Sequence, residues 1–209
     1  LRPSADLIAG QLHGLGMRVQ TTGPDDAPLV IGRRAGRATP TLLLYHRFDT
    51  PPPGPWSAWS HEPYQLAERD GALFGRGVAT AKGPLAAHVQ ALHALLQADG
   101  ELPCGVAIVA DGGGLRGTPS LPAALAAHGE LLRADGVLGS AGERDLHGTP
   151  LCYNGCKGQL QLRLSARGPA HPLPPGTAPA VRNPLWRLAW ALAALKGDDE
   201  DIRIPGFYD

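Results

Sequence analysis

Residues 41–49 read Thr-Leu-Leu-Leu-Tyr-His-Arg-Phe-Asp, and this stretch decides the fold. Its first five residues form a short, continuous apolar run, which is the pattern of a strand covered on both faces of a sheet. Residues 106–110 form a second such run, and between the two runs residues 84–96 place their apolar side chains in one helical stripe. A strand, a helix and a strand in this order indicate parallel strands joined by a crossover helix.

The neighbouring segments extend the same architecture. Ser4 is expected to cap a first helix that ends at Gly14 or Gly16. Further strands are predicted at 17–22, 29–32 and 137–138, a hairpin at 64–68 and 72–74 around residues 69–71, and a helix at 118–128. The sequence therefore predicts an α/β fold with a mostly parallel sheet flanked by helices.

The pattern changes after Gly158. Residues 159–167 alternate polar and apolar side chains, as a half-exposed antiparallel strand does. A proline-rich loop follows, and Asn183-Pro184 starts a further helix. We expect a domain boundary near 157, with an incomplete α/β domain at 1–157 and the beginning of a second α+β domain at 158–209.

Composition narrows the classes of partner. Lys plus Arg and Asp plus Glu number 19 each, the isoelectric point is near 7.3, and no apolar run approaches the roughly 20 residues of a membrane span. We therefore expect no nucleic acid and no membrane span. The three irregularly spaced cysteines, Cys104, Cys152 and Cys156, and the absence of a signal segment predict a cytoplasmic protein. Cys152 and Cys156 would form only half of a metal site.

Four motifs, in this order and spacing, carry a family resemblance. Residues 42–49 come first, then Leu-Phe-Gly-Arg-Gly at 73–77 continuing to Lys-Gly-Pro at 82–84, then Gly-Thr-Pro-Ser-Leu at 117–121, and finally Ile-Pro-Gly-Phe-Tyr-Asp at 204–209. They resemble the aminoacylase, carnosine dipeptidase and glutamate carboxypeptidase family of two-zinc metallopeptidases. The resemblance implies a catalytic-type α/β domain followed by the first part of a lid or dimerisation domain.

The family mechanism depends on two zinc ions about 3.5–4 Å apart and on a glutamate that deprotonates the attacking water. The resemblance implies that the ligand histidine is replaced by Arg47, which has no lone pair to donate to a metal. The bridging aspartate is replaced by Thr80, the ligand glutamate by Leu115, and the fourth ligand by Ser140.

The general base and the remaining ligand also lack equivalents. Gly114 stands at the position of the general base, and the fifth ligand would lie beyond residue 209. In the second domain Leu173 replaces a substrate-contacting histidine, whereas Asp49, which orients the first ligand in the family, is retained. We therefore predict no bound cofactor, although the family binds zinc.

Three functions follow from this reading. The first is a non-catalytic homologue, or pseudoenzyme, that serves as a structural or regulatory partner, in a homodimer or heterodimer or together with further chain that covers the incomplete fold. The second is an active hydrolase with remodelled ligands, drawn from His46, Asp49, Asp111 and Cys152. The third is a module that binds a peptide-like ligand without cleaving it.

Two further hypotheses concern Arg47 and the histidines on the neighbouring elements. Arg47 could place a fixed positive charge where a zinc ion would sit, pairing with Asp49 and with Asp111, or it could simply point to solvent. His46 is displaced by one residue from the ligand position, which on a strand turns its side chain to the opposite face. His88 and His93 are five residues apart, so we expect them to border the helix stripe and not to form a ligand pair.

Overall fold

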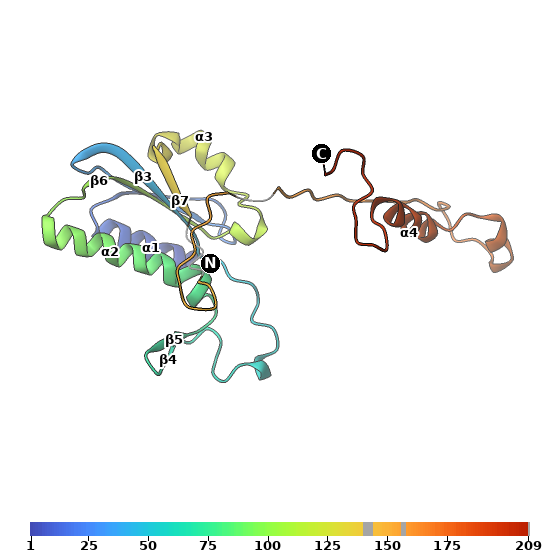
Figure 1. The fold of residues 1–209 in the computed structure, drawn as a ribbon, viewed down its shortest axis with the longest axis horizontal. Helices are drawn as coiled ribbons and strands as arrows, with labels where there is room; N and C mark the ends of the chain where they lie inside the picture. Colours follow the sequence, from blue (N-terminus) through green and yellow to red (C-terminus); the bar gives the residue numbers. More distant parts are fainter. Residues whose placement is uncertain (140–143, 156–157, 209) are drawn as a thin grey trace. The chain divides into compact units, whose positions relative to one another are not determined.

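A five-stranded mixed sheet in the order β1-β2-β6-β3-β7 forms the middle layer of the first part of the chain in the computed structural model, which describes residues 1–139, 144–155 and 158–208 (Figure 1). Its strands are β1 (Arg18–Thr22), β2 (Leu29–Arg34), β3 (Ala38–Arg47), β6 (Cys104–Asp111) and β7 (Gly136–Gly139). Strand β2 is antiparallel to both of its neighbours, whereas β6, β3 and β7 pair in parallel. All strands of this sheet except β2 therefore run in one direction, which confirms the predicted fold class.

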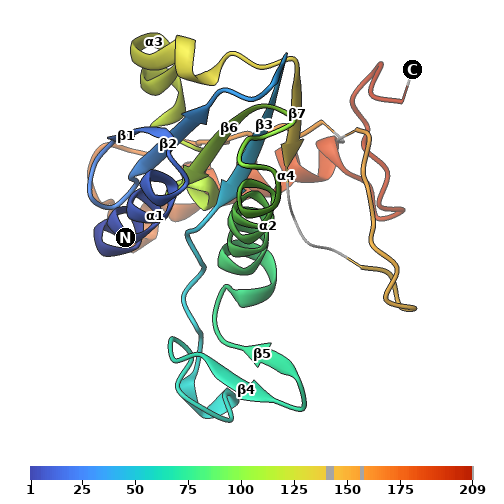
Figure 2. The same cartoon turned by 90° about the vertical axis from the view of Figure 1, so that its left-hand side faces the viewer.

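Helices cover both faces of the sheet. On one face α1 (Arg2–Gly14) and α2 (Gly83–Asp99) pack on Leu44, Phe48 and Ile108, and on the other face α3 (Leu121–Leu132) packs on Leu43 and Val109 (Figure 2). Alternate residues of β3 and β6 thus supply two separate cores. This explains the continuous apolar runs in the sequence, because a strand buried on both faces has no side that can be polar.

The connection between β3 and α2 lies outside this sandwich. It contains the short helix η1 (Trp56–Ala58), the hairpin of β4 (Ala67–Arg69) and β5 (Ala72–Phe74), and a π-helix, η2 (Val78–Lys82), directly before α2. Asp70 and Gly71 both adopt positive φ at the hairpin turn. The predicted hairpin is therefore present, with its first strand starting later than expected.

Two local expectations for the helices were wrong. Ser4 does not cap α1, which begins at Arg2 with Leu1 at the N-cap and no side-chain hydrogen bond there. Helix α3 begins at Leu121, because Thr118 has a φ of 56° and so lies in the left-handed region, which a right-handed helix cannot include. The short helix η3 (Gly114–Arg116) lies between β6 and α3.

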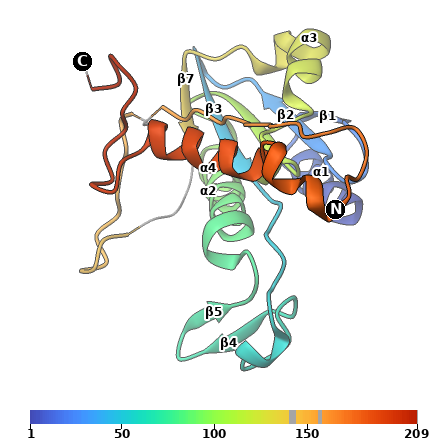
Figure 3. The ribbon, with the colours of Figure 1, turned by 90° about the vertical axis from the view of Figure 1, so that its right-hand side faces the viewer.

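The chain divides into two compact units, Leu1–Cys152 and Tyr153–Asp209, while the expected boundary at 157 lies outside the described residues. The second unit contains the short helix η4 (Pro175–Ala180) and α4 (Pro184–Leu195), red in Figure 3. As predicted, Asn183 caps α4, its Oδ1 accepting a hydrogen bond from Leu185 N at 2.9 Å. No helix in the described part of the chain is long and apolar enough to cross a membrane.

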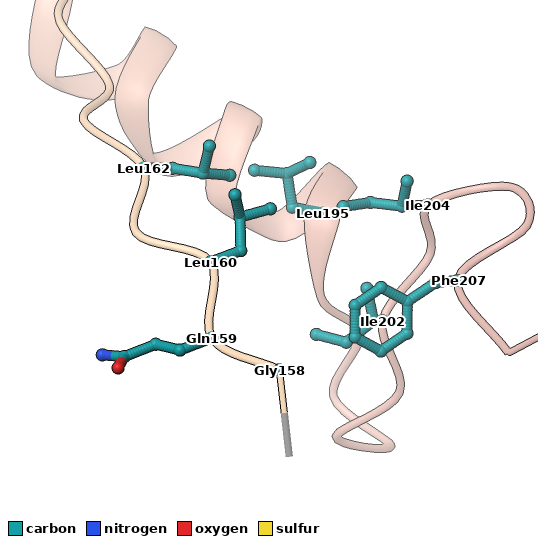
Figure 4. Close-up of a pocket in the computed structure, with 8 residues that line it drawn as sticks. All are labelled: Gly158, Gln159, Leu160, Leu162, Leu195, Ile202, Ile204 and Phe207. Atoms are coloured by element: carbon teal, nitrogen blue, oxygen red, sulfur yellow. The ribbon is translucent and has the colours of Figure 1, made fainter. Parts of the chain in front are cut away.

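The predicted strand at 159–167 is not formed. This segment pairs with no strand among the described residues, and alternation alone provides side-chain faces but no backbone partner. Two of its leucines instead line a hollow of about 690 Å³ within the second unit (Figure 4). Leu160 and Leu162 lie on one side of it, and Leu195 of α4, Ile204 and Phe207 lie on the other.

Candidate functional site

Several of the residues that the resemblance assigns to the family site, Arg47, Asp49, Gly114 and Leu115, gather where β3 and β6 end. The two strands are in register so that Arg47 is level with Asp111, and Asp49, Gly114 and Leu115 follow within a few residues. Ligand sites of open α/β sheets lie at the carboxyl ends of their strands. The fold therefore keeps the location of a site, and the side chains there determine what chemistry is available.

The side chain of Arg47 fills the space beside Gly114. A Cβ atom at position 114 would lie 2.4 Å from both Cγ and Cδ of Arg47 and 3.2 Å from its Cβ. Carbon atoms that are not bonded to each other do not approach so closely. Gly114 is thus the residue that lets the aliphatic stem of Arg47 lie across the β6–α3 loop, and any larger side chain there displaces it.

Asp49 is buried and fixes the same loop from the opposite side. Its Oδ2 accepts a hydrogen bond from Leu115 N at 2.7 Å, and its Oδ1 is buried without a hydrogen-bond partner among the described residues. Lys82 lies close enough for its charge to interact with Asp49, and its Nζ donates to Phe48 O at 2.9 Å. Burial lowers the pKa of Lys82, and the Asp49 carboxylate opposes that shift. The retained aspartate therefore orders a backbone turn.

Asp111 is fully buried and both of its carboxylate oxygens are used. Oδ2 accepts from Tyr45 Oη at 2.8 Å, and Oδ1 accepts from Gly113 N at 2.8 Å. Tyr45 also contacts Thr118 Oγ1 at 3.3 Å, and burial raises the pKa of its hydroxyl. This network links the ends of β3 and β6 to the start of the α3 segment, which is a structural role.

His46 projects from the other face of β3, as its position in the strand predicts. Its ring is almost completely buried, and its Nε2 lies 2.9 Å from Nδ1 of His88 on α2. Burial, and secondarily the charge of His88, lowers the pKa of His46 to about 4. His88 therefore does more than border the helix stripe, since it pairs with a strand residue that a helix pattern cannot reveal.

The residues at these positions do not fit two zinc ions. Thr80 lies exposed in η2, Leu115 offers an apolar side chain, Arg47 offers a cation, and Ser140 lies outside the described residues. Among the described residues no group of three or more His, Cys, Asp or Glu side chains is arranged to hold a metal ion. Oδ1 of Asp49 is unpartnered and would offer one ligand atom, whereas each zinc ion needs several anionic or neutral ligands.

The remodelled ligand set from the sequence is not brought together. His46 faces α2, whereas Asp111 binds Tyr45 and Gly113 on the α3 side of the sheet. Cys152 lies exposed at the end of the first unit, and Cys156 lies outside the described residues. This set is therefore wrong, because His46 is level with Ala110 and Asp111 with Arg47, and successive positions along paired strands project to opposite faces.

The ion pairing proposed for Arg47 is also wrong. Within the described ranges Arg47 forms no salt bridge, since Asp49 binds a backbone N–H and Asp111 binds a tyrosine and a backbone N–H. Arg47 is half-buried through its stem. The sequence did not reveal this contact with Gly114, which joins two segments far apart along the chain.

Residues 43–139 match the family model described as peptidase family M20/M25/M40. A cysteinylglycine-S-conjugate dipeptidase of Corynebacterium striatum is 34% identical over 80% of this chain and 38% of its own length. A succinyl-diaminopimelate desuccinylase of Bordetella petrii is 33% identical over 93% of this chain and 51% of its own length. The chain thus spans about half or less of the length of these relatives.

Solved structures agree with the sequence matches. An M20 family metallo-carboxypeptidase from Sulfolobus solfataricus superposes with a TM-score of 0.79 and 26% identity, covering 99% of this chain and 47% of that one. Human carnosine dipeptidase 1 has the same fold, with a TM-score of 0.65, 22% identity and 46% of its chain covered. The motifs, the sheet order and these likenesses agree, and the chain is similar to members of peptidase family M20/M25/M40.

Proposed function

We propose that the chain is a non-catalytic homologue of the zinc-dependent dipeptidases and aminoacylases, acting as a structural or regulatory partner in an assembly. The observation that carries this proposal is the contact between Arg47 and Gly114. One residue stands at the position of a metal ligand and the other at that of the general base. Each has lost the chemistry of its position, and the two now fit each other sterically.

This fit makes the loss of chemistry difficult to reverse. A glutamate at position 114 would need its Cβ where the stem of Arg47 lies, so regaining the base requires changing both residues. At the next position Leu115 contributes only its N–H, which is bound by Asp49. The buried cores around β3 and β6 support the same view, because the scaffold is packed while the site positions carry unreactive side chains.

Exposed apolar surface is the observation that motivates the partner role. The relatives that the chain matches are about twice its length or more, and their names describe a dipeptidase and a desuccinylase. We propose that a homologous subunit or further chain completes the fold. Leucines 160, 162 and 164 and the edge strand β7 offer exposed apolar surface for such a complement.

Zinc titration of the purified chain tests the loss of the metal site. We expect no saturable zinc binding in calorimetry and no release of amino acid from cysteinylglycine-type dipeptides or N-succinyl amino acids. A matched variant with Arg47→His, Thr80→Asp and Leu115→Glu restores three ligand positions and retains Gly114. It should gain saturable zinc binding, which verifies that the assay detects a site at this place.

Two results decide against the proposal. About two equivalents of zinc bound by the unaltered chain, together with turnover of either substrate class, would show a working two-metal centre. Zinc binding of equal affinity in the unaltered chain and in the restored variant would show that the replaced positions are not the ligands.

A further inference from the structure

The charges of this chain are strongly segregated along its sequence. Acidic and basic residues balance at 19 each, but no Asp or Glu occurs between Asp145 and Asp198. The same stretch contains six basic residues, namely Lys157, Arg163, Arg167, Arg182, Arg187 and Lys196. The neutral total therefore conceals a basic segment that includes all of α4 and the chain before it.

Two tryptophans lie on α4 within this basic segment. The rings of Trp186 and Trp190 stack on each other, with centroids 6.3 Å apart and planes inclined by 27°. Both are largely exposed, at 61% and 66%, and together with Arg182, Asn183 and Arg187 they line a hollow of about 500 Å³. We call these five residues the Trp–Arg patch.

The Trp–Arg patch lies on the face of α4 that the second unit does not use for its own apolar contacts. Leu195 points into the hollow formed with Leu160 and Leu162 (Figure 4). At about 100° per residue, Trp190 and Trp186 are rotated from Leu195 by roughly 140° and 180°. Leu195, which lines that hollow, and the indole pair therefore lie on opposite sides of one helix.

The two guanidinium groups of the patch are available for binding. Neither Arg182 nor Arg187 forms an ion pair with a described residue, whereas three acidic residues after α4, Asp198, Asp199 and Glu200, pair locally. Lys196 pairs with Glu200, and Arg203 pairs with Asp198 at 3.5 Å. The nearest acidic residues in sequence are thus already engaged by other cations.

We infer that the Trp–Arg patch is a docking site for an acidic peptide segment that also carries an apolar or aromatic side chain. Guanidinium groups bind carboxylates with paired, charge-assisted hydrogen bonds, and exposed indoles supply the large rigid contact area typical of interface hot spots. Two arginines are too few to follow a phosphodiester backbone, whose binding grows with each phosphate neutralised. The inference concerns the second unit and does not depend on catalysis in the first.

Fluorescence anisotropy on the full chain tests this site. The probe is a labelled peptide of about 12 residues, rich in Asp and Glu with one Trp and one Leu, and a matched probe replaces the acids by Asn and Gln. We expect saturable binding of the acidic probe only. Trp186→Ala with Trp190→Ala should weaken it about tenfold or more, and Arg182→Gln with Arg187→Gln about fivefold, with a reduced dependence on salt.

The chain offers two matched controls. Trp56, 58% exposed in η1 of the first unit, controls for the loss of an exposed indole, and Trp56→Ala should not change the affinity. Arg163→Gln with Arg167→Gln removes the same charge from the same basic segment outside the patch and should change the affinity less than about twofold.

Several outcomes overturn the inference. These are equal binding of the two probes, no saturable binding, or patch and control variants that weaken binding alike. Tighter binding of oligothymidylate than of the acidic peptide would make the surface a nucleic-acid site. Self-association that is lost in the patch variants would make a second copy of the chain its occupant. Circular dichroism of each variant verifies that these exposed substitutions leave the fold intact.

Discussion

His46 and Arg47 are neighbours on β3, and the structure treats them in opposite ways. His46 faces α2, is 1% exposed and pairs with His88 across the strand–helix interface. Arg47 faces the loop after β6, is half-buried and forms no ion pair within the described residues. Two successive residues of β3 thus differ in role: His46 is buried in the core beside His88, whereas Arg47 contacts the loop at Gly114 through its aliphatic stem.

This contrast reflects how the side chains are packed on the two faces of the sheet. On the α1–α2 face Leu44 of β3 lies in one core with residues of both helices, so a replacement there must fit a close-packed interior. At the ends of β3 and β6, Arg47 instead lies against a loop of consecutive glycines, where the absence of a Cβ at position 114 leaves room for its stem.

Acid should destabilise the chain most strongly through His46. Burial holds its pKa at about 4, well below the ordinary value of 6.5, so the unfolded chain binds this proton more readily than the folded chain does. The contribution of the neutral His46 ring to the free energy of unfolding is therefore complete above pH 6.5 and is lost as the pH falls toward 4. It amounts to on the order of 3 kcal/mol, measurable as the change in unfolding free energy between pH 7 and pH 4.5.

The test compares variants by their pH dependence. His46→Gln keeps a hydrogen-bonding group toward His88 but does not titrate, so it should flatten the loss at low pH. His93→Gln removes an exposed histidine of α2, the helix that carries His88, and should leave the pH dependence unchanged. Equal slopes for the unaltered chain and His46→Gln would mean that His46 is not buried as a neutral ring.

Gly114→Ala should destabilise the chain by about 1–3 kcal/mol, because the added methyl group overlaps the stem of Arg47. Removing that stem should relieve the overlap. In a double-mutant cycle with Arg47→Ala the two changes should therefore couple, with the double variant more stable than the sum of the single effects predicts. Urea unfolding of the four proteins measures the coupling.

A second glycine controls for the backbone effect of the substitution. Gly10 lies in α1 with open space around its would-be Cβ, so Gly10→Ala should stabilise the chain by roughly 0.5–1 kcal/mol. Opposite signs at Gly10 and Gly114 would identify the contact with Arg47 as the cause. Additive effects in the cycle would count against a steric fit between the two positions.

The sequence was sufficient where the information is local or periodic. The apolar run of β3 and the register implied by its motif predicted both the buried strand and the orientation of His46 away from Arg47. The Asn183-Pro184 signal predicted the start and the cap of α4. Each of these depends on residues within one or two turns of a helix or on the alternation of one strand.

Contacts between distant segments could not be predicted in this way. The His46–His88 pair, the bond from Leu115 N to Asp49 and the overlap of Arg47 with position 114 join residues 42 or more positions apart in sequence. A sequence pattern gives the face of an element but not the atom that it meets. The absent strand at 159–167 shows the same limit, since its alternation predicts exposure and burial but cannot supply a backbone partner.

The smallest expected effect belongs to the charge of Arg47. Arg47→Met keeps the aliphatic stem beside Gly114 and removes the guanidinium, so it should change the unfolding free energy by no more than about 0.5 kcal/mol. A loss above about 1 kcal/mol, diminished by added salt, would instead show that the charge stabilises the fold by pairing with a carboxylate. Since Asp49 and Asp111 already bind N–H and O–H donors, we expect the neutral stem to be sufficient, which makes the fit of Arg47 to Gly114 a matter of shape.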